Sequence, residues 1–522
     1  MTREPQTALP RGRRSFAVTA GLRDDAPAEP SRATIAVIGG GFSGTLLTLH
    51  LLRRCPEARV LLIERNQQFG RGLAYGTGNE THLLNVPAGK MSAFQDRPRH
   101  FVEWLAAQHA EGREAALLGE GSFVPRQLFG AYVRHLLNME MKSGAASRLE
   151  LLRGEVVDIE DGRHLVLALD RGRRVAAHLA IVAVGNFPPE PPPVADPWLY
   201  ESPWYRGDPW AADTLADLDP AAPVLLIGSG LTMIDTVLSL LDRGHEGPLY
   251  ALSRRGLLPR HHARHSVTPE FPAMALPATV SGLMRLVRSE ITAARARGVS
   301  WQAVIDALRP VTQELWLTLP PAERARFLRH LRPWWDVHRH RVSPGVAARI
   351  DAALKRGQLT IAAGRIAGYA PGLAGIAVEY QTPRRGDRRI EGFGRVINCS
   401  GPACDFARVR NPLIARLLAR GGARPDDLRL GLDVTLQGAL RGSDGAISQR
   451  LYAVGPLTKG AFWEMTAVPD IRRQCELLAA HLAQRVTAAR FPALEMPGPH
   501  AGAIAAGPWL PDESFFQDCG TA

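Results

Sequence analysis

The sequence predicts an α/β fold with two Rossmann-like units, because one strand-turn-helix pattern with clustered glycines occurs twice along the chain. Each copy begins with a short apolar strand and continues into a helix-like run. Apolar strands that end on a glycine recur after the second copy. Together these observations predict one nucleotide-binding domain inserted into another.

The first copy covers residues 34–52, TIAVIGGGFSGTLLTLHLL. Its glycines fall at Gly39, Gly41 and Gly44, between the strand and the helix. In this pattern the first glycine permits the turn, the second lets a pyrophosphate approach the backbone, and the third lets the helix pack on the strand. The alternative is a glycine-rich turn that holds no ligand.

An acidic residue at the end of the next strand favours the nucleotide interpretation. The apolar run at residues 60–63 ends in Glu64, about twenty residues after the glycines. An acid at this position would bind a ribose hydroxyl. We therefore expect the first unit to hold a dinucleotide.

The second copy starts at residue 223 and carries Gly228 and Gly230, with Met233 in place of the third glycine. That position serves helix packing more than phosphate contact, so the pattern is weakened and not lost. The following strand ends in Ser253, Arg254 and Arg255. Two arginines here would bind the 2′-phosphate that separates NADPH from NADH, although they could also be exposed loop residues.

Three further apolar strands end on a glycine: one ends on Gly185, before the second copy, and two end on Gly401 and Gly455, after it. Two cradles, the first continued by strands that recur after the second, are typical of two-dinucleotide flavoproteins. The first cradle would hold FAD and the second NADPH or NADH. The predicted division is a disordered tail at 1–30, an FAD-binding domain at 31–222 and 393–490, an NAD(P)H-binding domain at 223–392 with a helical insert at about 266–345, and a C-terminal tail at 491–522.

Composition excludes several other classes of protein. The net charge of +12 comes from scattered arginines without a basic block interleaved with aromatics, so we expect no nucleic-acid partner. No apolar run reaches the eighteen or so residues of a membrane span. The five cysteines have no CxxC spacing, which excludes a redox-active CxxC pair and indicates a reducing compartment. Arg13 and Arg14 hint at an export signal, but charged residues cut its apolar region short, and we expect a cytoplasmic protein without a metal site.

Five stretches carry a resemblance to a known family. They are IGGGFSG at 38–44, HLLNVPA at 82–88, GSGLTM at 228–233, HRHR at 338–341 and GPLT at 455–458. Over residues 34–484 the chain resembles the bacterial FAD/NAD(P)-binding proteins that include FAD-dependent urate hydroxylase and L-aspartate N-monooxygenase. The resemblance implies an NAD(P)H-dependent flavin monooxygenase that uses dioxygen and a small-molecule substrate. It also implies that Asn85 and residues 466–469 lie near the flavin ring.

These arguments give two sets of candidate residues. The expected cofactor-binding set is Gly39, Gly41, Ser43, Gly44, Glu64, Arg65, Asn85, Gly185, Gly228, Gly230, Arg254, Arg255, Gly401, Gly455, Thr466 and Ala467. The candidate catalytic set is His338, Arg339, His340, Arg341 and Glu464. The histidines and arginines could bind an anionic substrate, or they could cap the helical insert and face solvent.

Within the resembled family the substrate could be urate or L-aspartate, and both are small anions. Aspartate would require two separate cationic contacts, whereas urate is a flat ring that prefers aromatic surface. The candidate segments offer Trp334, Trp335, Phe462 and Trp463, which favours urate and its product 5-hydroxyisourate. An amino-acid N-monooxygenase is the alternative. A flavin oxidoreductase that passes electrons to a protein or quinone, and a non-catalytic nucleotide sensor, are alternatives of other classes.

Overall fold

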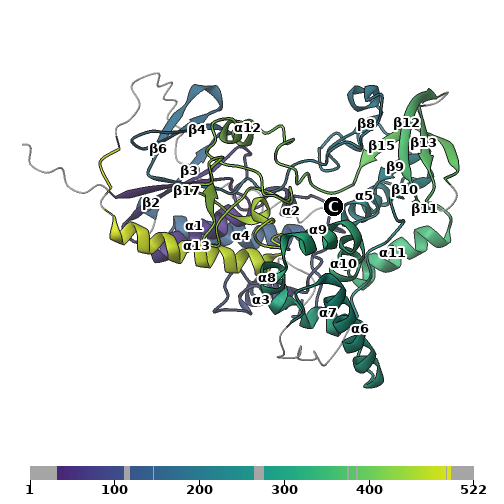
Figure 1. Cartoon of the computed structure of the whole chain (residues 1–522), viewed down its shortest axis with the longest axis horizontal. Coiled ribbons are helices and arrows are strands. Elements are labelled where there is room, and N and C mark those ends of the chain that lie inside the picture. Colours follow the sequence, from purple (N-terminus) through teal and green to yellow (C-terminus); the bar gives the residue numbers. More distant parts are fainter. Residues whose placement is uncertain are drawn as a thin grey trace, which may run out of the picture.

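The computed structural model describes residues 32–110, 118–144, 146–263, 276–372, 375–383, 386–489 and 491–494. The tail predicted at 1–30 and all but four residues of the tail predicted at 491–522 lie outside these ranges. Two α/β bodies stand side by side, and a group of helices packs below the space between them (Figure 1).

The first body is built on a six-stranded sheet. Its order is β16 (Ala439–Arg441), β17 (Ile447–Ala453), β7 (Leu179–Val182), β1 (Ala33–Ile38), β2 (Ala58–Glu64) and β3 (Leu149–Arg153). All pairs are parallel except β16 with β17 at the edge. Every residue of β1 is buried, as its unbroken apolar run predicts for a central parallel strand. Helices α1 (Phe42–Arg54), α4 (Arg126–Met141) and α13 (Val468–Ala488) pack together on this body.

The second body is built on a five-stranded parallel sheet. Its order is β11 (Leu359–Ala363), β10 (Leu249–Ser253), β9 (Val224–Ile227), β15 (Arg395–Asn398) and β8 (Tyr205–Arg206). Helices α5 (Leu231–Asp242) and α11 (Pro344–Lys355) contribute to its core. Strands β8 and β15 lie outside residues 223–392. The boundaries predicted at 222/223 and 392/393 therefore place β8 and β15 in the first domain, whereas both strands belong to the second sheet.

Two small antiparallel sheets and three further helices complete the two bodies. The small sheets are β4 (Val156–Asp161), β5 (Leu165–Leu169) and β6 (Arg174–Ala177), and β12 (Arg365–Gly372), β13 (Gly375–Gln381) and β14 (Arg388–Phe393). The helices are α2 (Gly72–Tyr75), α3 (His100–Ala110) and α12 (Pro412–Ala419), of which α12 packs against β4.

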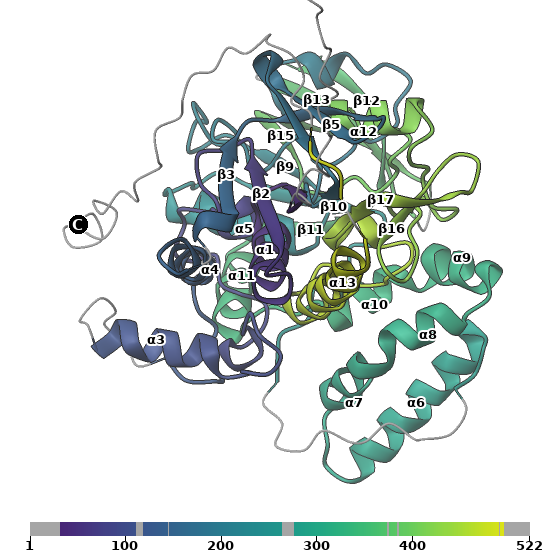
Figure 2. The ribbon, with the colours of Figure 1, turned by 90° about the vertical axis from the view of Figure 1, so that its left-hand side faces the viewer.

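A helical insert joins the second body to the first. It comprises α6 (Val280–Ala296), α7 (Trp301–Ala307), α8 (Thr312–Thr318), α9 (Pro321–His330) and α10 (Arg332–Arg339), all within the predicted range of 266–345. Figure 2 shows these helices as a separate group beside α13. Trp316 of the insert and Trp463 of the loop before α13 stack with ring centroids 4.8 Å apart. The insert therefore docks on a loop of the first body through buried aromatic rings.

Polar contacts also connect the two bodies directly. Arg126 of α4 and Asp235 of α5 form an ion pair of 2.9 Å between side chains that are 11% and 9% exposed. His82 lies beside this pair, with Nε2 2.9 Å from the Ser239 hydroxyl and 3.0 Å from the Asp235 carbonyl. No helix within the described ranges is both long enough and apolar enough to cross a membrane.

The buried imidazole of His50 predicts sensitivity to acid. Burial, reinforced by the charges of Arg53 and Arg54, lowers the pKa of His50 to about 4, below its usual value of 6.5. The unfolded chain therefore binds a proton more readily, and stability is lost as the pH falls from about 6.5 towards 4. By this linkage the lowered pKa of His50 reduces the free energy of unfolding by about 2 kcal/mol at pH 5.

A His50→Leu variant should lose less thermal stability than the unmodified protein between pH 7.5 and pH 5.0. Scanning calorimetry at the two pH values measures the difference in Tm. The control is His330→Leu, because His330 is exposed at the end of α9. Equal acid sensitivity of His50→Leu and the unmodified protein would contradict the assignment.

Candidate functional site

The two cradles have the same backbone geometry at their first glycines. Gly39 has φ +108° and Gly228 has φ +111°, a region that only glycine enters without strain. A Cβ at Gly39 would lie 2.5 Å from the Ala183 carbonyl oxygen, and one at Gly228 would lie 2.6 Å from that of Cys399. Each first glycine thus lets the turn cross closely over the end of a neighbouring strand.

The second glycines are not required by packing. Gly41 and Gly230 are the N-terminal caps of α1 and α5, both with ordinary negative φ. A Cβ at Gly41 would lie 3.4 Å from the Cα atom of Gly72, and within the described ranges a Cβ at Gly230 meets nothing within 4 Å. The open space lies at the N-terminus of each helix, where backbone N–H groups attract a phosphate. By contrast, a Cβ at Gly44 would lie 1.9 Å from the Gly39 carbonyl oxygen, so Gly44 serves packing.

A cavity of about 950 Å³ runs from the first cradle into the space between the two bodies. Many of the predicted cofactor-binding residues line it: Gly39, Gly41, Ser43, Glu64, Arg65, Gly185, Gly401 and Thr466. Thr232 and Asp242 of α5 line its far side. The cavity therefore joins the first cradle to a helix of the second body.

Glu64 holds its carboxylate at the edge of this cavity. The side chain is 7% exposed and accepts hydrogen bonds from the backbone N–H groups of Gly40 at 2.7 Å and Asn66 at 2.8 Å. A carboxylate fixed at the carboxyl end of β2 can accept a further hydrogen bond from a ribose hydroxyl. Arg65 instead points to Glu155 at 3.4 Å and is largely exposed. The first cradle and Glu64 thus fit the pyrophosphate and ribose of FAD.

The other predicted cofactor residues take several different positions. Gly185 has φ +75° and Gly401 has φ +95°, and within the described ranges a Cβ on either would meet nothing within 4 Å. Gly455 packs closely on Ser43, since its Cβ would lie 2.7 Å from the Ser43 hydroxyl oxygen. Ala467 is the N-terminal cap of α13.

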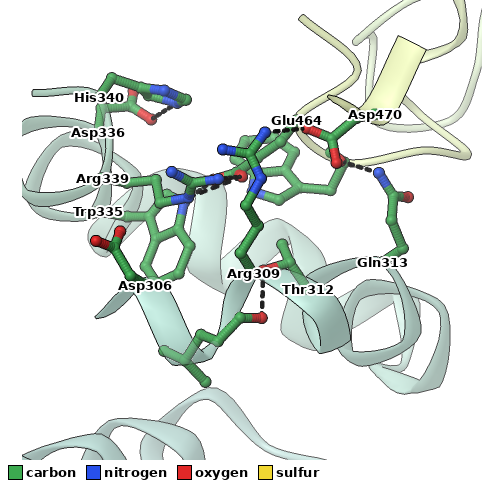
Figure 3. Close-up of polar contacts among 12 residues, drawn as sticks. Asp306, Arg309, Thr312, Gln313, Trp335, Asp336, Arg339, His340, Glu464 and Asp470 are labelled. Atoms are coloured by element: carbon green, nitrogen blue, oxygen red, sulfur yellow. Dashed lines mark hydrogen bonds and ion pairs between the residues drawn. The ribbon is translucent and has the colours of Figure 1, made fainter. Parts of the chain in front are cut away.

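The side chains of Arg339 and Glu464 meet in a buried cluster between the insert and the first body (Figure 3). They are 7% and 4% exposed, and Arg339 places Nε and Nη2 each 3.0 Å from Glu464 Oε2. The indole N–H of Trp335 donates to Glu464 Oε1 at 2.6 Å. Glu464 has φ +63°, an unusual conformation for a residue with a side chain. The bonds to its carboxylate hold that conformation in place.

The remaining members of the HRHR stretch do not join this cluster. His338 lies with Nδ1 2.7 Å from the Trp334 carbonyl and with its ring against Trp301. His340 approaches Asp336 at 3.9 Å, and desolvation of the ring by burial lowers the pKa of His340 to about 4, so its imidazole is neutral at pH 7. Among the described residues, neither histidine is hydrogen-bonded to the Arg339–Glu464 pair, although the charge of Arg339 acts on the His340 ring.

Arg341 is the most deeply buried cation of the stretch, with 2% exposure. Its Nη2 pairs with Asp306, whereas its Nε and Nη1 have no hydrogen-bond partner among the described residues. The charge of Arg341 contributes, after burial, to lowering the pKa of His262 to about 4. His262 in turn places Nε2 2.9 Å from the carbonyl oxygen of Asn85. Arg341 therefore lies close to the segment that the family resemblance places near the flavin.

The residues that fix the two bodies against each other, Arg126 and Asp235, are not among the site residues predicted from the sequence. The HLLNVPA stretch contributes there only to the family resemblance. One signal was available, because Asp235 interrupts an apolar helix directly after the second glycine pattern. A buried acid on such a helix requires a partner.

Comparison with known proteins supports the fold. Residues 36–187 match the model of a family described as FAD-NAD(P)-binding, so the first unit is an FAD/NAD(P)-binding domain. In an alignment of 524 positions the chain is 22% identical to an uncharacterised protein of Mycobacterium tuberculosis. The alignment covers 87% of this chain and 96% of the relative.

Three solved structures share the architecture. The ornithine N-hydroxylase of Kutzneria sp. 744 has a TM-score of 0.60 at 14% identity and covers 87% of this chain and 100% of its own. The L-lysine 6-monooxygenase of Pseudomonas syringae has a TM-score of 0.59 at 16% identity and covers 88% of this chain and 99% of its own. The bacillithiol disulfide reductase of Staphylococcus aureus has a TM-score of 0.51 at 11% identity and covers 87% of this chain and 98% of its own. The predicted two-dinucleotide flavoprotein fold is confirmed, and both monooxygenases and reductases use it.

Because the space beside Gly41 is open, we expect a small side chain at this position to reduce flavin binding without disturbing the fold. Gly41→Ala should fold normally but bind FAD at least tenfold more weakly, because its methyl group would occupy the position where a pyrophosphate approaches. The flavin absorbance of the purified protein and titration of the apoprotein with FAD measure this. Gly121→Ala is the control, since the structure gives its Cβ open space away from the cavity. A normal flavin content in Gly41→Ala would remove the assignment.

Because the Arg339–Glu464 pair is buried, we expect the loss of one partner to lower the stability of the protein substantially. Arg339→Ala leaves a buried carboxylate without its cation and should destabilise the docking of the insert by about 3 to 5 kcal/mol. Limited proteolysis and thermal unfolding measure the effect. The matched control is Arg326→Ala, because the Arg326 side chain is 61% exposed and its pair with Glu323 is worth less than about 1 kcal/mol. Similar behaviour of the two variants would show that the buried pair is not important for docking.

Proposed function

We propose that this chain is an FAD-dependent, NADPH-consuming monooxygenase that hydroxylates the amine nitrogen of a small amino acid. Bound FAD would accept a hydride from NADPH and pass electrons to dioxygen. The net reaction is R–NH₂ + O₂ + NADPH + H⁺ → R–NHOH + NADP⁺ + H₂O. The protein supplies the two cradles, the binding site for the amino acid and an enclosure that excludes water.

The cysteines favour dioxygen over a disulfide as the acceptor of electrons. All four cysteines within the described ranges are free, and Cys55, Cys399 and Cys475 are buried. Burial raises the pKa of Cys55 to about 11 and that of Cys399 to about 12, so neither thiol is ionised at neutral pH. Thiol-disulfide exchange requires a thiolate, and Cys55 and Cys399 do not offer one. Cys404 is half-buried at a second cavity and has no second cysteine at CxxC spacing.

One observation carries the choice of an amino acid as substrate: the incompletely paired guanidinium of Arg341. A buried arginine with two unused N–H donors is costly unless a ligand pairs with it. A carboxylate can accept a charge-assisted hydrogen bond from such a donor. Asp306 already accepts from Nη2, and Nε and Nη1 lie on different edges of the guanidinium, so each of them can donate a single bond to a further anion. Arg341 would therefore hold the carboxylate of the substrate.

Two of the four aromatic side chains that favoured urate, Trp335 and Trp463, are engaged elsewhere. Trp463 is 3% exposed and stacks on Trp316, and Trp335 donates to Glu464. Trp334 is 44% exposed to solvent. Neither these rings nor Arg341 line the cavity of about 950 Å³, so its lining alone does not separate the two substrates. The preference for urate loses its support, and the amino-acid alternative is the better hypothesis.

The structural neighbours support the same choice. The two that match with the higher TM-scores are named for ornithine and lysine, which carry both a carboxylate and a side-chain amine. Aspartate, the substrate of one member of the resembled family, shares the carboxylate and the α-amine. These three amino acids are the first substrates to test.

The test follows NADPH oxidation by the FAD-loaded enzyme with ornithine, lysine, aspartate or urate, each scored for a substrate-dependent rate and for a hydroxylamine product. An amino acid should stimulate oxidation and yield the hydroxylamine. Its α-carboxamide analogue should lose ten- to a hundredfold in kcat/KM, since the analogue keeps the amine but lacks the charge that Arg341 would bind. Stimulation by urate with loss of its ultraviolet absorbance would overturn the proposal. Equal turnover of the amino acid and its amide would remove Arg341 from the substrate site.

A further inference from the structure

A second cavity, of about 530 Å³, lies at the carboxyl end of the second sheet. It is lined by Arg254 after β10, by Ser400 and Gly401 after β15, and by Arg332 at the start of α10. Nucleotides bind at the carboxyl ends of parallel strands in such folds. The nucleotide of the second cradle is therefore expected beside residues from both the sheet and the helical insert.

Positive charge accumulates at this cavity. The pKa of Arg254 is lowered because the protein partly desolvates the guanidinium and because the charges of Arg365, Arg332 and Arg255 act on it. Like charges this close repel one another, so the cluster carries an electrostatic cost in the absence of an anion. A group with two negative charges would relieve that cost.

The carboxylates that line the cavity do not neutralise Arg254. Asp405 pairs with Arg429 at 2.9 Å, and Glu190 pairs with Arg408 at 2.9 Å. Asp336 lies 3.4 Å from Arg332 on the same helix. Among the described residues Arg254 itself has no ion-pair or hydrogen-bond partner.

We propose that Arg332 of the helical insert binds the 2′-phosphate of NADPH together with Arg254 of the second cradle. This inference rests on the proposed use of NADPH and adds a residue that the glycine-rich pattern does not contain. The insert would then determine nucleotide specificity as well as dock on the loop before α13. Arg332 can exchange its exposed contact with Asp336 for the phosphate at little cost, because such surface pairs are weak.

The position of Arg332 on α10 links this site to the buried cluster. Arg332, Trp335 and Arg339 are three and four residues apart in succession, so they lie along one face of the helix. Trp335 and Arg339 both bond to Glu464 on the loop before α13. The same helix face would therefore contact the nucleotide at its start and the first body at its end.

The experiment measures binding of 2′,5′-ADP and 5′-AMP to the FAD-loaded enzyme by isothermal titration calorimetry. These probes differ in the 2′-phosphate and require no substrate or turnover. The unmodified protein should bind 2′,5′-ADP more tightly than 5′-AMP. Arg332→Ala should weaken binding of 2′,5′-ADP about tenfold and leave 5′-AMP unchanged, and Arg254→Ala should behave in the same way. Arg332→Lys should recover part of the affinity.

The matched control is Arg329→Ala, because Arg329 is an exposed arginine of the neighbouring helix α9 and does not line the cavity. If Arg254→Ala weakened binding of 2′,5′-ADP but Arg332→Ala did not, the role of Arg332 would be overturned and that of Arg254 would stand. Equal affinity of the unmodified protein for the two probes would overturn the NADPH site as a whole. Failure of the amino-acid substrate would alter neither binding result.

Discussion

The arrangement of the two nucleotide-binding bodies depends on the buried ion pair between Arg126 and Asp235. Each side chain is almost fully removed from solvent, and each comes from a helix that packs on a different sheet. Replacing either side chain by an uncharged one would leave the other charge unpaired in a desolvated site, at a cost of about 3 to 5 kcal/mol. His82 extends the contact to Ser239, and burial lowers the pKa of His82, so this hydrogen bond is made by a neutral ring. The cavity that joins the first cradle to α5 exists because these contacts hold the two bodies in register.

The HLLNVPA stretch gains a physical role from this arrangement. His82 contacts α5, and three residues later the Asn85 carbonyl lies 2.9 Å from Nε2 of His262, which follows β10. Both contacts reach from the first body to the second. The stretch therefore acts as a connection between the bodies on the side where the family resemblance places the flavin ring. Because it links the bodies at two points, it restricts their rotation more than a single contact would.

The sequence predicts the local parts of this structure well, and it predicts the long-range parts poorly. Gly39 and Gly228 are recognisable because the requirement for a positive φ and close strand contact is encoded within a few residues. The assignment of β15 to the second sheet depends on its pairing with β9, about 170 residues earlier, which no local pattern reports. The sequence suggests that Trp463 lines a pocket, but an aromatic residue in a loop can equally well pack on another ring. In the structure Trp463 packs on Trp316, and no local pattern distinguishes the two cases. The approach of Arg332 to Arg254 depends in turn on how the insert folds back across the second sheet.

The conformation of the loop before α13 depends on the docked insert. Glu464 adopts a positive φ that costs a non-glycine residue about 1 kcal/mol, and the bonds from Arg339 and Trp335 to its carboxylate offset that cost. Thr466, only two residues further along, lines the first cavity, and Ala467 caps the helix that follows. An insert that moved away would remove the partners of Glu464, and the backbone up to Ala467 would be free to relax. The N-terminus of α13 is therefore positioned by side chains of the insert, so the wall of the first cavity is completed by residues that belong to neither nucleotide cradle.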